Sequence, residues 1–284
     1  MQSLKRISFA AVLACLVLPA QASPALAAET AQGGQSARVP YADLADLADS
    51  ARLVLRAQVR TLARVENERA PGLRPGWGRF FVKAKTRMLL TGDTPLGEDL
   101  RYLVDLPLDA RGKAPSVKKK DVLLFARPVS GRPGEIQLVA PDAQLLWDEA
   151  LEARLRAILT ELVAPDAPGR ITGVREIIHV PGNLAGEGET QIFLSTSDRS
   201  AASITVRHRP GAPPMWGVSF SELVADVGNP PRRETLAWYR LACFLPDRLP
   251  RGANHSETAA GRAQAEADYR MVLGELGTCS SSRR

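Results

Sequence analysis

The chain of 284 residues is poor in the side chains on which enzyme and metal sites are most often built. It has 3 histidines and 3 cysteines, and it contains no HExxH motif, no CxxC motif and no cluster of cysteine with histidine. The sequence therefore lacks the usual signatures of a zinc site and of a dithiol redox site. The sequence therefore predicts neither a metal nor a cofactor.

Long apolar runs are also scarce, and the one that approaches membrane length lies at the N-terminus. Lys5 and Arg6 precede an apolar run over residues 7–18. Small residues then follow at the spacing that a signal peptidase reads, namely Ala20 with Ala22 and Ala25 with Ala27. The run is too short for a membrane anchor, which takes about 20 residues. The sequence predicts a signal peptide over 1–28, a periplasmic or secreted protein, and no membrane span after cleavage.

The few cysteines divide between the signal peptide and the C-terminal half. Cys15 lies inside the apolar run, where a loose lipobox makes lipid attachment an alternative. Cys243 and Cys279 remain, and an even number in an exported chain predicts a disulfide, with two free thiols as the alternative. In a simple antiparallel pair of C-terminal helices, Cys279 lies beside Arg232 instead. A bond within the chain therefore requires helices that cross steeply.

Alternation of apolar and polar residues dominates the first half of the mature chain. It predicts strands over 52–65, 79–90, 100–105, 122–128 and 136–139. A flexible leader over 29–40 and a short helix over 41–49 precede these strands. Five strands in about ninety residues predict a small antiparallel OB-like β-barrel, closed or nearly closed, over residues 41–147.

The second half predicts helices as well as strands. An amphipathic helix over 151–163 marks the domain boundary, so residues 148–169 are assigned to a connecting helix. The predicted strands are 174–180, 190–195, 203–209 and 215–223. Two helices follow, one from an N-cap at Asn229 to Leu245 and one over 258–276 that Gly277 ends. Residues 170–284 are predicted to form an α+β domain of four antiparallel strands and two helices, in a chain that is mostly β and of the α+β class.

Short apolar motifs carry a resemblance to known proteins. A short helix, then ADSARLVLRAQV, a strand that ends in MLLTG and a later DVLLFARPV resemble a recurrent N-terminal module of exported bacterial proteins. That module is similar to OB-fold domains of the netrin and metalloproteinase-inhibitor kind. The second half, with LAWYRLACFLP, resembles uncharacterised exported proteins of alphaproteobacteria. The resemblance implies an OB-like barrel and export, and it supplies no catalytic residues.

The histidines and serines form no catalytic pattern, so the sequence predicts no catalytic residue. His179, His208 and His255 stand apart from one another, and Ser219 and Ser221 in GVSFSE do not form the Gly-x-Ser-x-Gly elbow. Catalytic groups need not be neighbours in the sequence. An envelope hydrolase with a dispersed site in the interdomain cleft therefore stays open as the alternative.

Positive charge gathers in the first half of the chain. Residues 52–87 contain ten basic residues against two acidic ones. Alternation places six of them on one face of two strands, namely Arg56, Arg60, Arg64, Lys83, Lys85 and Arg87. A second cluster consists of Arg111, Lys113 and Lys118–Lys120. Like charges that lie opposite each other destabilise a sheet, so acidic neighbours or an anionic partner would relieve them.

The predicted function is therefore binding by a non-catalytic exported protein. An anionic envelope component, such as a lipid phosphate or an acidic glycan, fits the six cations, and so does an acidic protein. Nucleic acid is not expected, given export and because Phe81 is the only aromatic residue on the basic face. The alternative is that the basic face is solvated and contributes only to solubility.

Overall fold

The computed structural model describes residues 39–94, 96–221 and 229–283, which form four α-helices and two antiparallel sheets. The predicted signal peptide and the leader up to residue 38 lie outside the described residues. Val39–Arg284 make one compact unit. No helix in the described ranges is long and apolar enough to cross a membrane. The predicted α+β class, mostly β, is confirmed.

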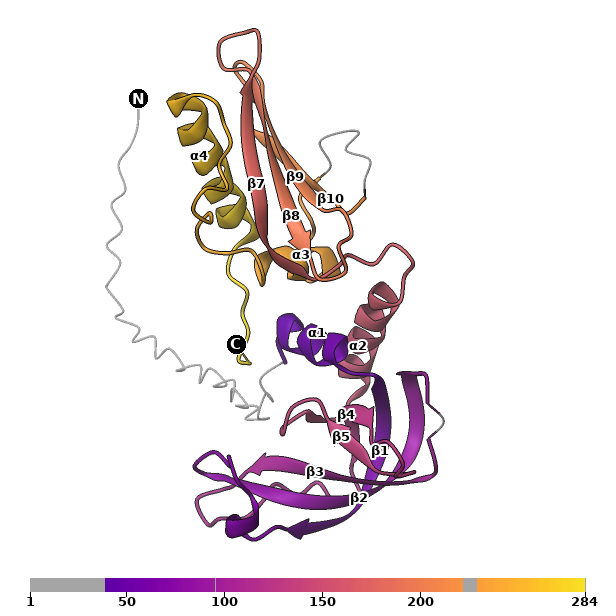
Figure 1. Cartoon of the computed structure of the whole chain (residues 1–284). Coiled ribbons are helices and arrows are strands. Elements are labelled where there is room, and N and C mark those ends of the chain that lie inside the picture. The colour runs from indigo at the N-terminus through magenta and orange to yellow at the C-terminus, as the bar shows by residue number, and fades with distance from the viewer. Residues whose placement is uncertain (1–38, 95, 222–228, 284) are drawn as a thin grey trace, which may run out of the picture. The chain divides into compact units, whose positions relative to one another are not determined.

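The N-terminal sheet follows helix α1 (Tyr41–Ser50) and has six strands (Figure 1). They are β1 (Leu53–Arg64), β2 (Trp77–Gly92), β3 (Asp99–Pro107), β4 (Asp121–Pro128), β5 (Ile136–Leu138) and β6 (Gln144–Leu146). The order is β3-β2-β1-β4-β5, and β6 also pairs with β4. Residues 122–126 of β4 are all buried, because α1 packs against this strand on the side away from the sheet core. Strands β2 and β3 instead alternate between buried and exposed residues over much of their length.

The sheet curls, but the predicted barrel does not close in the described residues. Strands β3 and β5 meet at one isolated parallel bridge, Arg101 with Glu135. The amide of Arg101 donates to the Gly134 carbonyl at 2.8 Å, and the amide of Asp105 donates to the Pro141 carbonyl at 2.7 Å. The segment from Gly134 to Pro141 is longer than the piece of β3 that it accompanies, so it bows away between the two contacts. Closure was therefore the wrong part of the barrel prediction.

The C-terminal sheet has four antiparallel strands in the order β10-β9-β8-β7. Its strands are β7 (Ile171–Pro181), β8 (Gly188–Thr196), β9 (Ser203–His208) and β10 (Met215–Ser219). Helix α2 (Glu149–Leu162) leads into it, and α4 (Ala259–Leu276) packs along β7 and β8 (Figure 1). Strand β10 ends at Ser219, short of the predicted 223, and residues 222–228 lie outside the described part of the chain.

Helix α3 (Leu236–Ala242) starts later than predicted, and this shift resolves the geometry of the cysteines. Its N-cap is Thr235, whose side chain accepts from the Trp238 amide, and not Asn229. Cys243 follows this short helix directly, and Cys279 follows the turn at Gly277, whose φ is 69°. The predicted disulfide is present, with a Cα–Cα distance of 5.1 Å.

Candidate functional site

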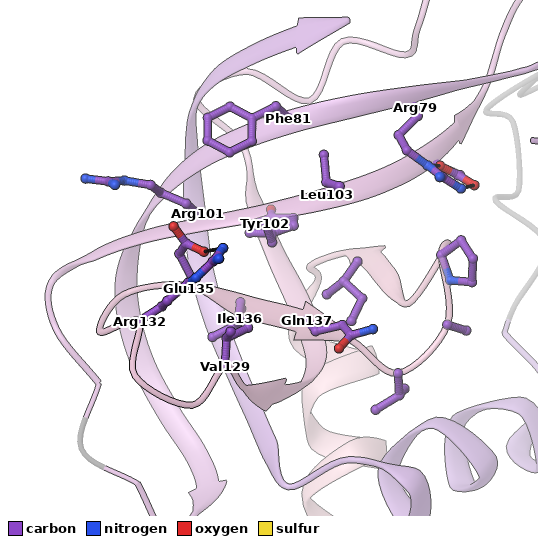
Figure 2. Close-up of a pocket in the computed structure, with 15 residues that line it drawn as sticks. Arg79, Phe81, Arg101, Tyr102, Leu103, Val129, Arg132, Glu135, Ile136 and Gln137 are labelled. Carbon is purple, nitrogen blue, oxygen red and sulfur yellow. Dashed lines mark hydrogen bonds and ion pairs between the residues drawn. The ribbon is translucent and has the colours of Figure 1, made fainter. Parts of the chain in front are cut away.

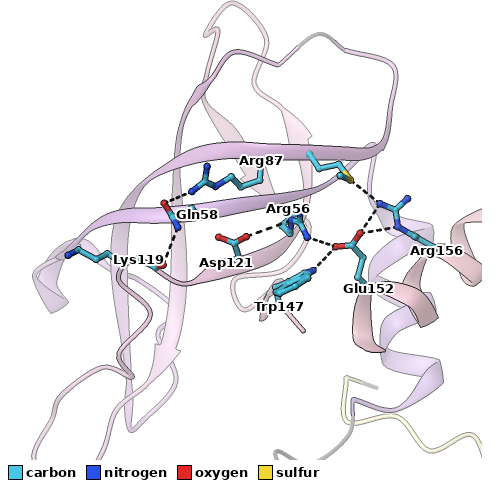
Figure 3. A network of polar contacts seen from close by, with 9 residues as sticks. Arg56, Gln58, Arg87, Lys119, Asp121, Trp147, Glu152 and Arg156 are labelled. Carbon is cyan, nitrogen blue, oxygen red and sulfur yellow. Dashed lines mark hydrogen bonds and ion pairs between the residues drawn. The ribbon is translucent and has the colours of Figure 1, made fainter. Parts of the chain in front are cut away.

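Arg56, the first of the six predicted cations, turns toward α2 and is neutralised there (Figure 3). Its Nη1 donates to Glu152 Oε2 at 3.2 Å, and its Nε lies 3.7 Å from Asp121 Oδ2. Its guanidinium also lies over the Trp147 ring, 4.8 Å from the centroid. Two carboxylates and an aromatic face therefore surround this arginine, so it does not belong to a free basic surface, although its buried Nε has no hydrogen-bond partner among the described residues.

Glu152 is the centre of this contact between α2 and the sheet. It accepts from Arg156 Nη2 at 2.7 Å and from the indole N–H of Trp147, besides Arg56 (Figure 3). Burial alone would raise the pKa of Glu152, but the hydrogen bonds from Arg156 and Trp147 and the charge of Arg56 lower it below its usual value. Glu152 thus stays ionised, and the network serves to hold α2 in place.

Lys85 and Arg87 are also engaged. Lys85 forms an ion pair with Glu98, and its hydrogen bond lowers the pKa of that carboxyl. Arg87 donates to Gln58 Oε1 at 2.8 Å. Arg56 and Lys85 thus have carboxylate partners, whereas Arg87 is exposed and its recorded partner, Gln58, is neutral.

Two of the three register shifts between β1 and β2 fall at these cations and explain why the six side chains do not share one face. Between β1 and β2, Val59 lies opposite Ala84 but Thr61 lies opposite Lys83, so Arg60 has no residue across from it. An extra residue of this kind bends a strand and redirects its side chains. The other bulge leaves Arg87 unopposed, because Arg56 faces Met88 while Ala57 faces Thr86.

The second basic cluster lies directly beside Arg60. The Lys119 amide donates to the Val59 carbonyl at 2.8 Å, and the Val59 amide donates to the Lys120 carbonyl at 3.0 Å. Gln58 Nε2 donates to the Lys119 carbonyl at 3.3 Å (Figure 3). Lys119 has φ 64°, a left-handed conformation that is uncommon outside glycine, and Lys118–Lys120 are all exposed. The chain therefore presents three successive lysines next to the bulge.

These side chains define a surface that we call the basic strip. It consists of five exposed cations, Arg60, Arg64, Lys118, Lys119 and Lys120. Among the described residues, none of them has an ion pair within 4.0 Å. Arg64 makes only a long contact, 3.4 Å, with the Gly112 carbonyl. Lys83, the sixth predicted cation, is exposed on β2 and likewise unpaired within the described ranges. Glu98, the partner of Lys85, lies close enough for the charge of Arg60 to lower its pKa, so the strip is only partly compensated and can still attract anions.

A second polar cluster, which the sequence did not reveal, lies between α4 and the C-terminal sheet. His179 Nδ1 is 2.8 Å from Thr190 Oγ1, and the Thr190 hydroxyl donates to Asp268. His208 Nε2 is 2.9 Å from the same carboxylate, which also accepts from Gln264. Thr190 is fully buried and Asp268 is 2% exposed, so neither can reach a substrate in this conformation. The cluster fastens α4 to the sheet, and no group of acidic, His or Cys residues suited to a metal occurs in the described part of the chain.

Comparison with known proteins adds no further information. No model of a known protein family matches the chain, and no curated protein matches it either. The resemblance to exported proteins with an OB-like module therefore stays a prediction. Function has to be argued from the arrangement of residues alone.

Proposed function

We propose that the protein is an exported, non-catalytic binding protein that holds an anionic ligand or partner on the basic strip. One observation carries the proposal. Pairing of the Val59 backbone with Lys119 and Lys120 brings Arg60 and the three lysines Lys118–Lys120, which are far apart in the sequence, to one place. A surface that serves solubility alone would intersperse its cations with carboxylates, as Lys85 is paired with Glu98.

The adjacency of these cations costs free energy that an anion would recover. Like charges held next to one another repel, here three lysines in the turn before β4 and Arg60 on β1, and Lys119 adopts a sparsely populated backbone conformation. A polyanion would turn this repulsion into attraction, and it would be steered to the strip from a distance. The same attraction should weaken as the salt concentration rises.

The compartment narrows the choice of ligand. A signal peptide over 1–28 would export the chain, and the disulfide between Cys243 and Cys279 fits an oxidising, periplasmic or secreted setting. The anions available there are lipid phosphates, acidic glycans and acidic proteins, so nucleic acid is not proposed. An envelope hydrolase has no supporting observation in the described residues, because Thr190 of the histidine cluster is buried.

The test changes Arg60, Lys118 and Lys120 together to Gln. Binding of the mature chain is measured with vesicles that contain phosphatidylglycerol, and separately with poly-glutamate. Each cation near an anionic surface contributes about 1 kcal/mol, so we expect the triple variant to bind roughly a hundredfold more weakly. Vesicle binding alone would identify a lipid headgroup, and poly-glutamate binding alone would identify an acidic protein.

A matched control removes the same charge elsewhere. Arg209, Arg248 and Arg251 are exposed and outside the strip, and their joint change to Gln should leave most of the binding intact. Equal losses in both triple variants would mean that only net charge matters. Unchanged binding in the strip variant would overturn the proposal.

A further inference from the structure

The opening between β3 and β5 is a cleft with a volume of about 700 Å³ (Figure 2). It lies where the sheet fails to close, between the contact of Arg101 with Gly134 and that of Asp105 with Pro141. Its size is that of a site for a small organic molecule. Its position differs from that of the basic strip, whose residues do not line it.

Unpaired strand edges border this cleft. The amides of Arg101 and Asp105 donate away from β2, so alternation directs the amide of Leu103, between them, toward the cleft. On the other side, Glu135 and Val139 hydrogen-bond to Val129 and Phe125, on the β4 side. The intervening backbone of Ile136 and Leu138 therefore faces the cleft as well.

Apolar side chains cover the middle of the site. On the outer face of the sheet Phe81 lies directly opposite Leu103, and these side chains are 37% and 49% exposed. Ile136 and Tyr102 line the cleft and are buried (Figure 2). Leu138 also lines it and is buried. Covering such a patch removes apolar surface from water, so an apolar body in this position is stabilised.

The charges at the cleft do not balance. Arg79 is held by Asp105 through two hydrogen bonds of 2.7 and 2.9 Å, and Arg132 pairs with Glu135 at 3.3 Å. Arg101 has no ion pair within the described residues. It lies directly opposite Lys83, which is also unpaired there, and the pair Phe81 with Leu103 comes next along the same face. Glu135, the bridge partner of Arg101, is held by Arg132, so an anion between Arg101 and Lys83 would relieve the repulsion of these two like charges.

We infer that this cleft binds a small amphipathic organic anion with one negative charge. Its apolar body lies against Phe81, Leu103 and Ile136, and its carboxylate or sulfonate accepts hydrogen bonds from Arg101 at the end of the cleft near Lys83. The remaining charged groups pair with each other, Arg132 with Glu135 and Arg79 with Asp105, and the second pair lies at the opposite end of the site.

The fluorescent probe 8-anilinonaphthalene-1-sulfonate tests the inference, because it joins an aromatic body to a single sulfonate. We expect a saturable fluorescence increase with one site per chain, and displacement of the probe by dodecanoate but not by dodecanol. Arg101→Gln should weaken binding by about tenfold or more, since one charge-assisted hydrogen bond is lost. Leu103→Gln should weaken it several-fold through the lost apolar contact.

Two controls separate this site from general effects. Leu146 is 49% exposed, like Leu103, but does not line the cleft, so Leu146→Gln should bind the probe as the wild type does. Arg209→Gln controls for the lost charge. All four positions are exposed, so the variants should fold, and circular dichroism checks this. Equal weakening in the controls, or no weakening in Arg101→Gln and Leu103→Gln, would overturn the inference.

The proposal for the cleft and the proposal for the basic strip can be contradicted separately. The triple variant of Arg60, Lys118 and Lys120 should lose vesicle or poly-glutamate binding and retain the probe. Arg101→Gln should retain vesicle or poly-glutamate binding and bind the probe more weakly. Loss of the probe in the triple variant would place the probe on the strip and would contradict a separate site in the cleft.

Discussion

His179 is a half-buried titratable group whose neighbours come from several elements. Thr190 on β8 accepts from its ring, Asp268 on α4 and His208 on β9 lie nearby, and its backbone N–H donates to Ser256 at 2.9 Å. Burial is the largest cause that lowers the pKa of His179, and the charge of His208 acts the same way, whereas Asp268 opposes both. The folded protein therefore favours the neutral ring.

The lowered pKa predicts that stability falls in mild acid. Below about pH 6.5 the unfolded chain binds a proton at His179 that the folded chain does not bind. The free energy of unfolding therefore decreases as the pH falls from about 6.5 toward the pKa of His179 in the folded protein. His179→Asn keeps a donor for Thr190 but does not titrate in this range, and it should flatten this dependence. Urea unfolding at about pH 7.5 and about pH 5.5 measures it. His255→Asn, at an exposed position, should keep the wild-type slope, and a slope that His179→Asn leaves unchanged would contradict the assignment.

At the scale of elements, strand β1 shows what the sequence can and cannot specify. Leu53, Leu55, Ala57 and Val59 alternate as predicted and are buried. Past the bulge the phase shifts, so Thr61 and Ala63 are exposed and Leu62 is half-buried. Thr61 and Ala63 are small enough for either face, so the sequence does not mark the slip. Because the sequence does not mark the bulge, the alternation of apolar and polar residues alone could not show whether the six cations share one face.

Helix α3 shows how a distant residue decides a boundary. Asn229 followed by Pro230 is a good helix start by local rules, yet Thr235 caps the helix. The carboxylate of Glu161, at the end of α2, accepts from the amide of Leu236 at 2.6 Å. This partner is 75 positions away in the sequence and therefore invisible to local reasoning.

The cluster of His179, Thr190 and Asp268 and the cleft between β3 and β5 also depend on long-range contacts. Only the cluster has a recognisable signal in the sequence. Asp268 interrupts an apolar stripe of α4 formed by Ala265, Tyr269 and Val272, and a buried carboxylate on such a stripe requires polar partners. The cleft depends on how β3 and β5 fail to meet, and their separate patterns do not contain that information. Strand β6, with three residues, is too short for a periodic signal.

The disulfide links the ends of two helices, α3 and α4, which are separated in the sequence. Cys243 ends α3 and Cys279 follows α4, with a separation of 36 residues. Closing a loop of this length in the unfolded chain should stabilise the protein by about 3–4 kcal/mol. We expect the double variant Cys243→Ala with Cys279→Ala to unfold at a correspondingly lower denaturant concentration. A reductant should bring the wild type to the same midpoint and leave the variant unchanged, and equal midpoints without reductant would contradict the prediction.

At the scale of the whole molecule, ion pairs tie the first helix to Arg170 and Arg240, and hydrogen bonds tie it to the end of the chain. Asp49 at the end of α1 accepts from both Nη atoms of Arg240 on α3, each at 2.8 Å, and also pairs with Arg170. Asp43 accepts from the hydroxyls of Ser281 and Ser282. The predicted boundary at 148–169 thus lies inside a unit whose two ends are joined by polar contacts.

These contacts predict that Val39–Arg284 unfolds in one cooperative transition, and Asp49 is the residue on which this depends most. Burial alone would raise the pKa of Asp49, but hydrogen bonds from Arg240 and Arg170 lower it, so the carboxylate stays ionised until strongly acidic pH. Arg240 is 4% exposed. Asp49→Ala leaves this arginine buried without its carboxylate, which typically costs about 3–5 kcal/mol.

Calorimetry of Asp49→Ala measures both the loss and its consequence for cooperativity. We expect a single endotherm for the wild type and a lower, divided endotherm for the variant, because the two sheets then unfold separately. Asp93→Ala is the matched control, since Asp93 pairs with Arg52 at 2.7 Å but both side chains are more than half exposed. That change should cost far less than Asp49→Ala, because solvent screens an exposed pair, and it should keep one transition. Two transitions in the wild type, or equal losses in the two variants, would show that the contacts of Asp49 do not couple the two sheets.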